Sequence, residues 1–161
     1  MITLFTIGYE GASLPDFIET LRLARVQHVL DVRDVPQSRR AGFSKKGLAA
    51  ALADQGFSYS HAKQLGDPKA GREAARRGDL EAFRRIFEAH LALEETQIAL
   101  LRAAHIASER ATVLLCFERD PSHCHRTLVA RSINELCSLN VQNLGVVHNA
   151  SRRDGAFRKA A

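Results

Sequence analysis

The sequence of 161 residues has few of the features that mark secreted or membrane proteins. Its three cysteines, an odd number, do not suggest a disulfide framework, so we expect free thiols in a reducing compartment. No apolar run approaches the ~18–20 residues that a membrane-spanning helix needs. Residues 1–8 lack the basic flank and long apolar stretch of a secretory signal and are typical of a first strand. We therefore expect a cytoplasmic protein without a membrane partner.

The familiar signatures of phosphate and dinucleotide sites are also missing. Neither the Walker pattern G-x-x-x-x-G-K-[ST] nor the fingerprint G-x-G-x-x-G occurs. A cysteine phosphatase loop places an arginine six positions after its cysteine, but Ala130 follows Cys124 at that distance and Ser122 follows Cys116. These absences argue against a phosphatase-like mechanism of the tyrosine-phosphatase or arsenate-reductase kind, and the cofactor stays unknown.

The composition fits one globular domain with a sizeable core, since 45% of the residues are apolar and 25% are charged. The net charge of +5 is compatible with a polyanionic partner or a phosphate-bearing substrate. Residues 149–161 contain three arginines and one lysine but little that is apolar. We expect a single domain over residues 1–148 followed by a basic, mobile tail. The oligomeric state stays open.

Apolar runs alternate with helical periodicity in the order β-α-β-α-β-(α-α)-β-α-β. This order predicts a mainly parallel five-stranded sheet with helices on both faces, a Rossmann-like three-layer α/β fold. The third strand should lie near an edge, and residues 63–71 should form a loop. The predicted strands cover residues 2–7, 26–32, 56–61, 111–117 and 144–148. The predicted helices cover residues 13–25, 46–54, 73–88 with a break at Gly78, about 90–108, and a segment after Cys124.

Three of the predicted strands end in unusual chemistry. The first ends in residues 8–11, Gly-Tyr-Glu-Gly, and the second in Arg33 and a basic loop. The fourth ends in residues 116–126, which hold two cysteines, two histidines, a glutamate and two arginines. Because the carboxyl ends of parallel strands lie at one edge of the sheet, we expect these segments to form one charged pocket.

The second strand and its loop carry opposite charges. Asp31 lies inside a buried strand, where a carboxylate needs a partner, and Arg33 shares its strand face. The loop that follows has four cations, including Arg39 and Lys45, and Ser44 is placed to begin a helix. Such a loop can cradle an anion, or it can simply be a solvated basic loop.

Within residues 116–126, two side chains are candidates for catalysis. Cys124 lies beside a helix N-terminus and Arg126, which would lower its thiol pKa and make it a nucleophile. The alternative is a small residue that packs the loop. Glu118 could act as general acid or base, or it could hold Arg33 or Arg126 in place.

A zinc site is an alternative interpretation of the same segment. Cys116, His123, Cys124, His125 and His148 are ligand types that zinc takes. Their spacing is not of the paired C-x-x-C type, and the adjacent side chains of Cys124 and His125 should point apart. We therefore expect no metal site.

Several segments together resemble the family known as domain of unknown function 488. They are residues 6–11, 31–39, 43–45, 59–66, 115–118 and 124–126. The family pattern often has two glycines after the leucine that is Leu65 here, but the second position is Asp67. The resemblance implies a compact α/β domain with a charged pocket, and it implies no settled activity.

These observations lead us to expect a pocket for a phosphate-bearing ligand, either a nucleotide or a nucleic-acid component. An arginine guanidinium can bind two anionic oxygens of such a ligand at once. If a reaction follows, we expect hydrolysis or group transfer that involves Cys124 and Glu118. The alternative is a non-catalytic nucleic-acid-binding or regulatory module that uses the basic loop, the arginines of residues 72–85 and the tail, with the Cys/His/Arg cluster structural. The candidate ligand-binding residues are Tyr9, Glu10, Arg33, Arg39, Ser44, Lys45 and Arg126.

Overall fold

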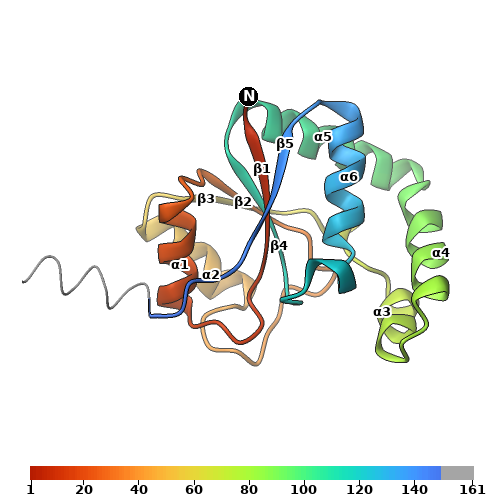
Figure 1. Cartoon of the computed structure of the whole chain (residues 1–161), viewed down its shortest axis with the longest axis horizontal. Helices are drawn as coiled ribbons and strands as arrows, with labels where there is room; N and C mark the ends of the chain where they lie inside the picture. Colours follow the sequence, from red (N-terminus) through yellow and green to blue (C-terminus); the bar gives the residue numbers. More distant parts are fainter. Residues whose placement is uncertain (150–161) are drawn as a thin grey trace, which may run out of the picture.

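The computed structural model describes residues 1–149 and shows a three-layer α/β fold with one parallel sheet between two layers of helices (Figure 1). The sheet order is β3-β2-β4-β1-β5, and every neighbouring pair of strands is parallel. The predicted parallel five-stranded sheet is therefore confirmed, with the third strand at an edge. The strands are β1 (Thr3–Gly8), β2 (His28–Asp31), β3 (Ser58–His61), β4 (Thr112–Cys116) and β5 (Asn140–Leu144).

The helices follow the predicted order along the chain. Ser13 begins the first of them as predicted, because its side chain accepts a hydrogen bond from the backbone N–H of Asp16. Gly78 separates the third and fourth helices, also as predicted. The α-helices are α1 (Leu14–Leu23), α2 (Lys45–Asp54), α3 (Lys69–Arg76), α4 (Leu80–Leu91), α5 (Glu94–Glu109) and α6 (Arg126–Leu136). Two short 3-10 helices are η1 (Lys63–Leu65) and η2 (Pro121–His123).

Each face of the sheet has its own hydrophobic core, because successive side chains of a strand point to opposite faces. On one face, Ile7 and Val113 pack with Phe17 of α1. On the other face, Leu4 and Leu114 pack with residues of α4, α5 and α6. Figure 1 shows α1 and α2 on one side of the sheet and α4, α5 and α6 on the other.

The connections between strands create a crevice at the end of β4. The chain leaves β1 and β2 through α1 and α2 on one face, whereas it leaves β4 through α6 on the opposite face. The two strands next to β4 in the sheet are β1 and β2. Chains that diverge to opposite faces leave a space at the carboxyl ends of the strands, where ligands bind in this class of fold.

The position predicted for the fifth strand is wrong. The apolar run of residues 144–148 suggested a strand there, but β5 is Asn140–Leu144. This strand pairs with β1 at the sheet edge, where most of its side chains are exposed. An edge strand is held by backbone hydrogen bonds and needs no continuous apolar run. Asn143 adds a side-chain bond, since its Oδ1 accepts from the Thr6 hydroxyl at 2.5 Å.

The loop predicted for residues 63–71 is partly helical. It contains η1, and α3 already begins at Lys69. Ala74 of α3 is fully buried in the core beneath α4. This packing overrides the turn-forming residues of the segment, as tertiary contacts commonly do.

The basic tail expected over residues 149–161 lies almost entirely outside the described part of the chain, which ends at residue 149. Across residues 1–149, none of the helices is both long enough and apolar enough to span a bilayer.

Candidate functional site

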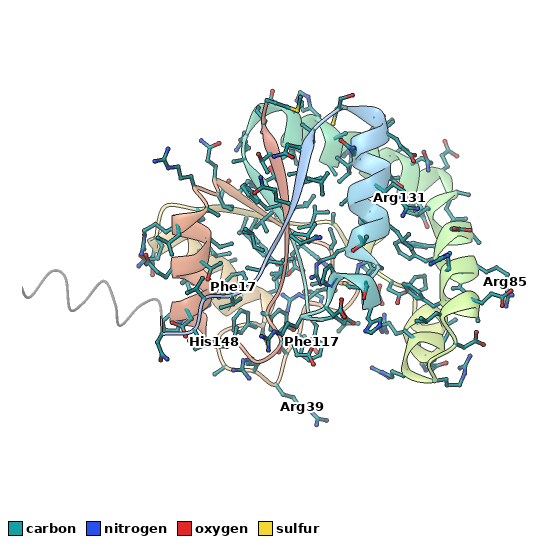
Figure 2. All side chains as sticks on the ribbon, viewed as in Figure 1. Phe17, Arg39, Arg85, Phe117, Arg131 and His148 are labelled. Carbon is teal, nitrogen blue, oxygen red and sulfur yellow. The ribbon has the colours of Figure 1, made fainter. Side chains whose placement is uncertain are left out.

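A pocket of about 960 Å³ opens at the carboxyl edge of the sheet. Its walls come from the segments that follow β1, β2 and β4 and from α3. Figure 2 shows Arg39 and Phe117 at this edge, beyond the ends of β1 and β4. Five of the predicted site residues line the pocket: Tyr9, Glu10, Arg33, Arg39 and Glu118.

Asp31 and Arg33 form a buried ion pair at the base of the pocket, so the partner that the buried carboxylate requires is Arg33. Arg33 Nη2 lies 2.6 Å from Asp31 Oδ2, and Nε donates to Oδ1 at 2.8 Å. Burial opposes the charged guanidinium, but the hydrogen bond and charge of Asp31 raise the pKa of Arg33 above its usual value. The Tyr59 hydroxyl also donates to Asp31, at 2.6 Å. Burial, and then this carboxylate, raise the pKa of Tyr59.

Aromatic rings connect this ion pair to the pocket surface. The Tyr9 hydroxyl accepts a hydrogen bond from Arg33 Nη1 at 3.2 Å. The Tyr9 ring stacks on Phe43 with centroids 4.4 Å apart and packs edge-on against Phe117 at 5.4 Å. Phe117 is 45% exposed. The pocket therefore offers an accessible aromatic surface above a rigid, buried base.

Some arginines of the pocket are already bound by other protein groups. Arg72 is held by Asp34, at 2.6 Å, and by the carbonyl of Asp67. Burial of Asp34 is outweighed by its hydrogen bonds from Arg72 and Lys63, which lower the pKa of this carboxyl. Arg40 donates to the carbonyl of Ala12.

Two pocket arginines remain available to a ligand. Arg39 and Arg76 line the pocket and are exposed, and neither forms an ion pair within residues 1–149. One comes from the loop after β2 and the other from the end of α3. They are therefore the guanidinium groups that an incoming anion could pair with at no cost in existing contacts.

Besides Asp34, three carboxylates share the pocket with these arginines. Glu10 accepts from the backbone N–H of Arg119 at 2.9 Å, and Glu118 accepts from the Cys116 thiol at 3.1 Å. Asp67 is buried, and its Oδ1 has no hydrogen-bond partner within the described residues. Burial raises the pKa of Asp67 to about 6, against the opposing effects of His125 and Arg72.

The pocket wall also includes residues that were not predicted to bind a ligand, among them Asp67, Arg72, Arg76, Phe117 and His125. Two features of the sequence point to some of these residues. Asp67 stands where the family pattern often has a glycine, and the four-residue spacing of Arg72 and Arg76 places them on one face of a helix. The spacing of Arg72 and Arg76 was not used, because the helix was predicted to begin at residue 73 and would not have included Arg72.

Arg126 lies beneath the pocket and does not line it. Its side chain is fully buried, and its guanidinium donates to the Thr6 hydroxyl at 3.2 Å and to the carbonyls of Glu118 and Arg119. Gly8 allows the loop to approach, because a Cβ at this position would lie 1.7 Å from the Glu118 carbonyl oxygen. The geometry gives Arg126 the task of fixing this loop, in place of the ligand contact expected from the sequence.

Ser44 and Lys45 lie at a second hollow of about 650 Å³, across residues 34–37 from the main pocket. The Ser44 hydroxyl accepts from the backbone N–H of Ser38 at 3.1 Å and lies 3.2 Å from its carbonyl oxygen. Lys45 Nζ lies 3.5 Å from His61 Nδ1. The four cations of the basic loop are therefore divided between two hollows: Arg39 and Arg40 line the main pocket, and Lys45 and Lys46 line the second hollow.

The environment of Cys124 differs from the one expected. Its side chain is buried and does not line the pocket, and α6 begins two residues later. Burial raises the pKa of the Cys124 thiol well above its usual value, so the lowered thiol pKa predicted from the helix N-terminus is wrong. Burial lowers the pKa of His125, but its contact with Cys124 outweighs burial and raises it.

Cys116, Cys124 and His125 come together at the pocket wall, where Cys116 and His125 line the pocket and Cys124 lies behind them. His125 Nδ1 lies 3.7 Å from Cys116 Sγ and 3.9 Å from Cys124 Sγ, and the three donor atoms all lie within 4.8 Å of one another. The expectation that Cys124 and His125 point apart is therefore wrong. Among the described residues, His123 and His148 do not join this cluster.

Comparison with known proteins gives one match. The family model described as Domain of unknown function DUF488 matches residues 13–133, well over half of the chain. No curated protein and no solved structure matches the chain. The match covers β2, β4 and the loops after them, which include most of the pocket. The chain therefore belongs to the DUF488 family.

Proposed function

We propose that the pocket binds a phosphate-bearing ligand, either a nucleotide or a nucleic-acid component. The observation that carries the proposal is the presence, in one pocket at the carboxyl edge of the sheet, of two exposed arginines that form no ion pair within residues 1–149, Arg39 and Arg76. A guanidinium binds two oxygens of a phosphate at once, and an unpaired one gives up no existing contact to do so.

The other walls favour a nucleotide over a free inorganic anion. Phe117 presents an exposed ring on which a base can stack. Glu10 and Glu118 carry carboxylate oxygens that can accept hydrogen bonds from ribose hydroxyls or base amino groups. The volume of about 960 Å³ is in the range of pockets for small organic ligands and far larger than one phosphate needs.

We propose hydrolysis or group transfer as the reaction of this ligand. Glu118 is the candidate general acid or base, because it lines the pocket and is half-buried. Cys124, the other candidate for catalysis, is 4% exposed, so a direct nucleophilic attack by its thiol would require the loop of residues 118–124 to move. Three free cysteines support a reducing, cytoplasmic location.

Calorimetric titration with matched pairs of ligands tests the binding proposal. A panel of nucleoside mono- and diphosphates should bind, whereas the corresponding nucleosides and inorganic phosphate alone should bind at least tenfold more weakly. Equal affinity for a nucleotide and its nucleoside would contradict the role of the arginines. Equal affinity for the nucleotide and inorganic phosphate would contradict the role of Phe117.

The alternative, a nucleic-acid-binding module, has its own supporting observation. Arg76 and Arg77 at the end of α3 and Arg84 and Arg85 on α4 are all exposed. Figure 2 shows Arg85 directed outward from α4. Salt separates the two proposals. A surface that makes many phosphate contacts loses affinity for an oligonucleotide steeply as salt rises, whereas a mononucleotide bound by two arginines loses far less.

A further inference from the structure

We propose that Cys116, Cys124 and His125 form a binding site for a divalent metal ion that takes sulfur and nitrogen ligands, with Zn²⁺ as the natural occupant. The three residues come from the end of β4 and from the segment that enters α6. This inference does not rest on the proposal of a phosphate-bearing ligand, because it depends only on these donor atoms and their surroundings.

The distances from the His125 nitrogen to the two sulfurs fit tetrahedral coordination. With Zn–S bonds of about 2.3 Å and Zn–N bonds of about 2.0–2.1 Å, a sulfur and a nitrogen ligand lie roughly 3.6 Å apart. The two Sγ–Nδ1 distances to His125 are 3.7 and 3.9 Å. The two sulfurs lie within 4.8 Å of each other, against roughly 3.8 Å in a tetrahedral site, so an ion would draw the two cysteine side chains together by at most about 1 Å in total.

The imidazole of His125 is already oriented as a ligand. Its Nε2 lies 2.7 Å from the carbonyl oxygen of Val32, which can only accept, so this nitrogen carries the proton. The lone pair of the neutral ring is then on Nδ1, the atom that faces the two sulfurs. Metal-binding histidines are commonly fixed in this way by a backbone carbonyl on the other ring nitrogen.

The surroundings also suit two thiolates. The backbone N–H of Arg126 points at Cys124 Sγ at 3.5 Å. Cys116 and Cys124 are only 5% and 4% exposed, and two buried thiolates need a compensating charge. A divalent cation supplies it, since the two thiols release their protons as the ion binds and the site becomes neutral overall.

The cluster borders the ligand pocket, which gives the metal a free position. Cys116 and His125 line the pocket together with Glu118 and Asp67. Three protein ligands leave a fourth position for water, as in catalytic zinc sites. Glu118 Oε2 lies 3.1 Å from Cys116 Sγ, and both residues line the pocket. Asp67, whose buried Oδ1 has no hydrogen-bond partner among residues 1–149, lies in the same wall.

Cobalt(II) titration of the full-length chain, reduced and free of metal, tests the site. We expect one Co²⁺ per chain, a thiolate-to-cobalt charge-transfer band in the near ultraviolet, strong visible bands of tetrahedral Co²⁺, and loss of all of them on addition of Zn²⁺. In weakly buffered solution each ion should release about two protons. Absence of the charge-transfer band from a folded chain whose thiols are all reduced would overturn the proposal.

Variants assign the site to these residues. Cys116→Ser and Cys124→Ser should each weaken Co²⁺ binding at least tenfold. Cys137→Ser removes the third thiol, which lies outside the cluster, and should leave the spectrum unchanged. A spectrum that survives in the Cys116→Ser/Cys124→Ser double variant, or one that is lost with Cys137→Ser, overturns the assignment. The measurements on the unmodified chain decide the question even if a variant fails to fold.

Discussion

Asp31 and Arg33, two residues apart at the end of β2, form a two-pronged ion pair that is almost completely shielded from water. Two bonds of 2.6 and 2.8 Å join the guanidinium to the carboxylate. Their side chains are 0% and 5% exposed. Arg33 also donates to the Phe43 carbonyl at 2.7 Å, so the pair ties the end of β2 to the loop that carries Arg39.

Removing one partner of this pair should strongly destabilise the fold. Arg33→Met leaves Asp31 buried without its cation, which costs about 3–5 kcal/mol in comparable sites. Urea denaturation followed by circular dichroism measures the loss. Lys69→Met is the control, because Lys69 pairs with Glu73 on the exposed surface of α3 and should contribute less than about 1 kcal/mol. A similar loss in both variants would contradict the central role of the buried pair.

The close approach of the loop after β4 to β1 should make Gly8 intolerant of any side chain. The Cβ of Gly8→Ala would collide with the Glu118 backbone, so the loop must shift and the unfolding free energy should fall by about 2 kcal/mol or more. Gly47→Ala, in an exposed turn of α2 with open space around it, should instead stabilise the chain by about 0.5–1 kcal/mol. Thermal melts of the two variants should therefore move in opposite directions.

His28 should make stability depend on pH. Burial, and then the charge of Arg110, lower its pKa from 6.5 to about 4, and its ring nitrogens contact the hydroxyls of Ser58 and Ser60. Between these two pKa values the unfolded chain binds a proton that the folded chain does not. The free energy of unfolding should therefore fall as pH drops from about 6.5 to about 4, by roughly 2–3 kcal/mol in total.

The measurement is a series of urea denaturation curves across this pH window. His28→Gln keeps a polar side chain but cannot titrate, so the difference in stability between the unmodified chain and the variant should shrink as pH falls. A difference that stays constant across the window would show that His28 is not the group responsible.

The two exposed arginines Arg39 and Arg76 should carry the nucleotide affinity of the pocket. Arg39→Ala and Arg76→Ala should each weaken binding of a nucleoside diphosphate by about 1.5–3 kcal/mol, the value of a charge-assisted hydrogen bond, while leaving stability within about 0.5 kcal/mol. Arg131→Ala is the control, since this exposed arginine of α6 does not line the pocket (Figure 2). Calorimetry should show unchanged affinity for the control; equal losses in all three variants would indicate a diffuse effect of net charge.

The sequence determined the fold class and the edge of the sheet that holds the pocket. Hydrophobic periodicity depends on burial on the two faces of the sheet, so the apolar runs of β1, β2 and β4 were sufficient to predict a parallel three-layer fold. The edge strand β5 was misplaced because backbone pairing, and not side-chain burial, holds it. The alternation of a strand placed Asp31 and Arg33 on one face, but the tertiary structure showed that they pair with each other.

Only the tertiary structure decided what the polar residues at that edge do. Arg126 is a buried brace for the loop at Glu118, Ser44 closes a loop, and Arg76 reaches the pocket from a helix that the sequence placed later. The direction of a side chain at a loop–helix junction depends on packing against distant segments, which spacing along the chain does not encode. The same physical reason brings Cys124 and His125, adjacent in sequence, to face one another and Cys116.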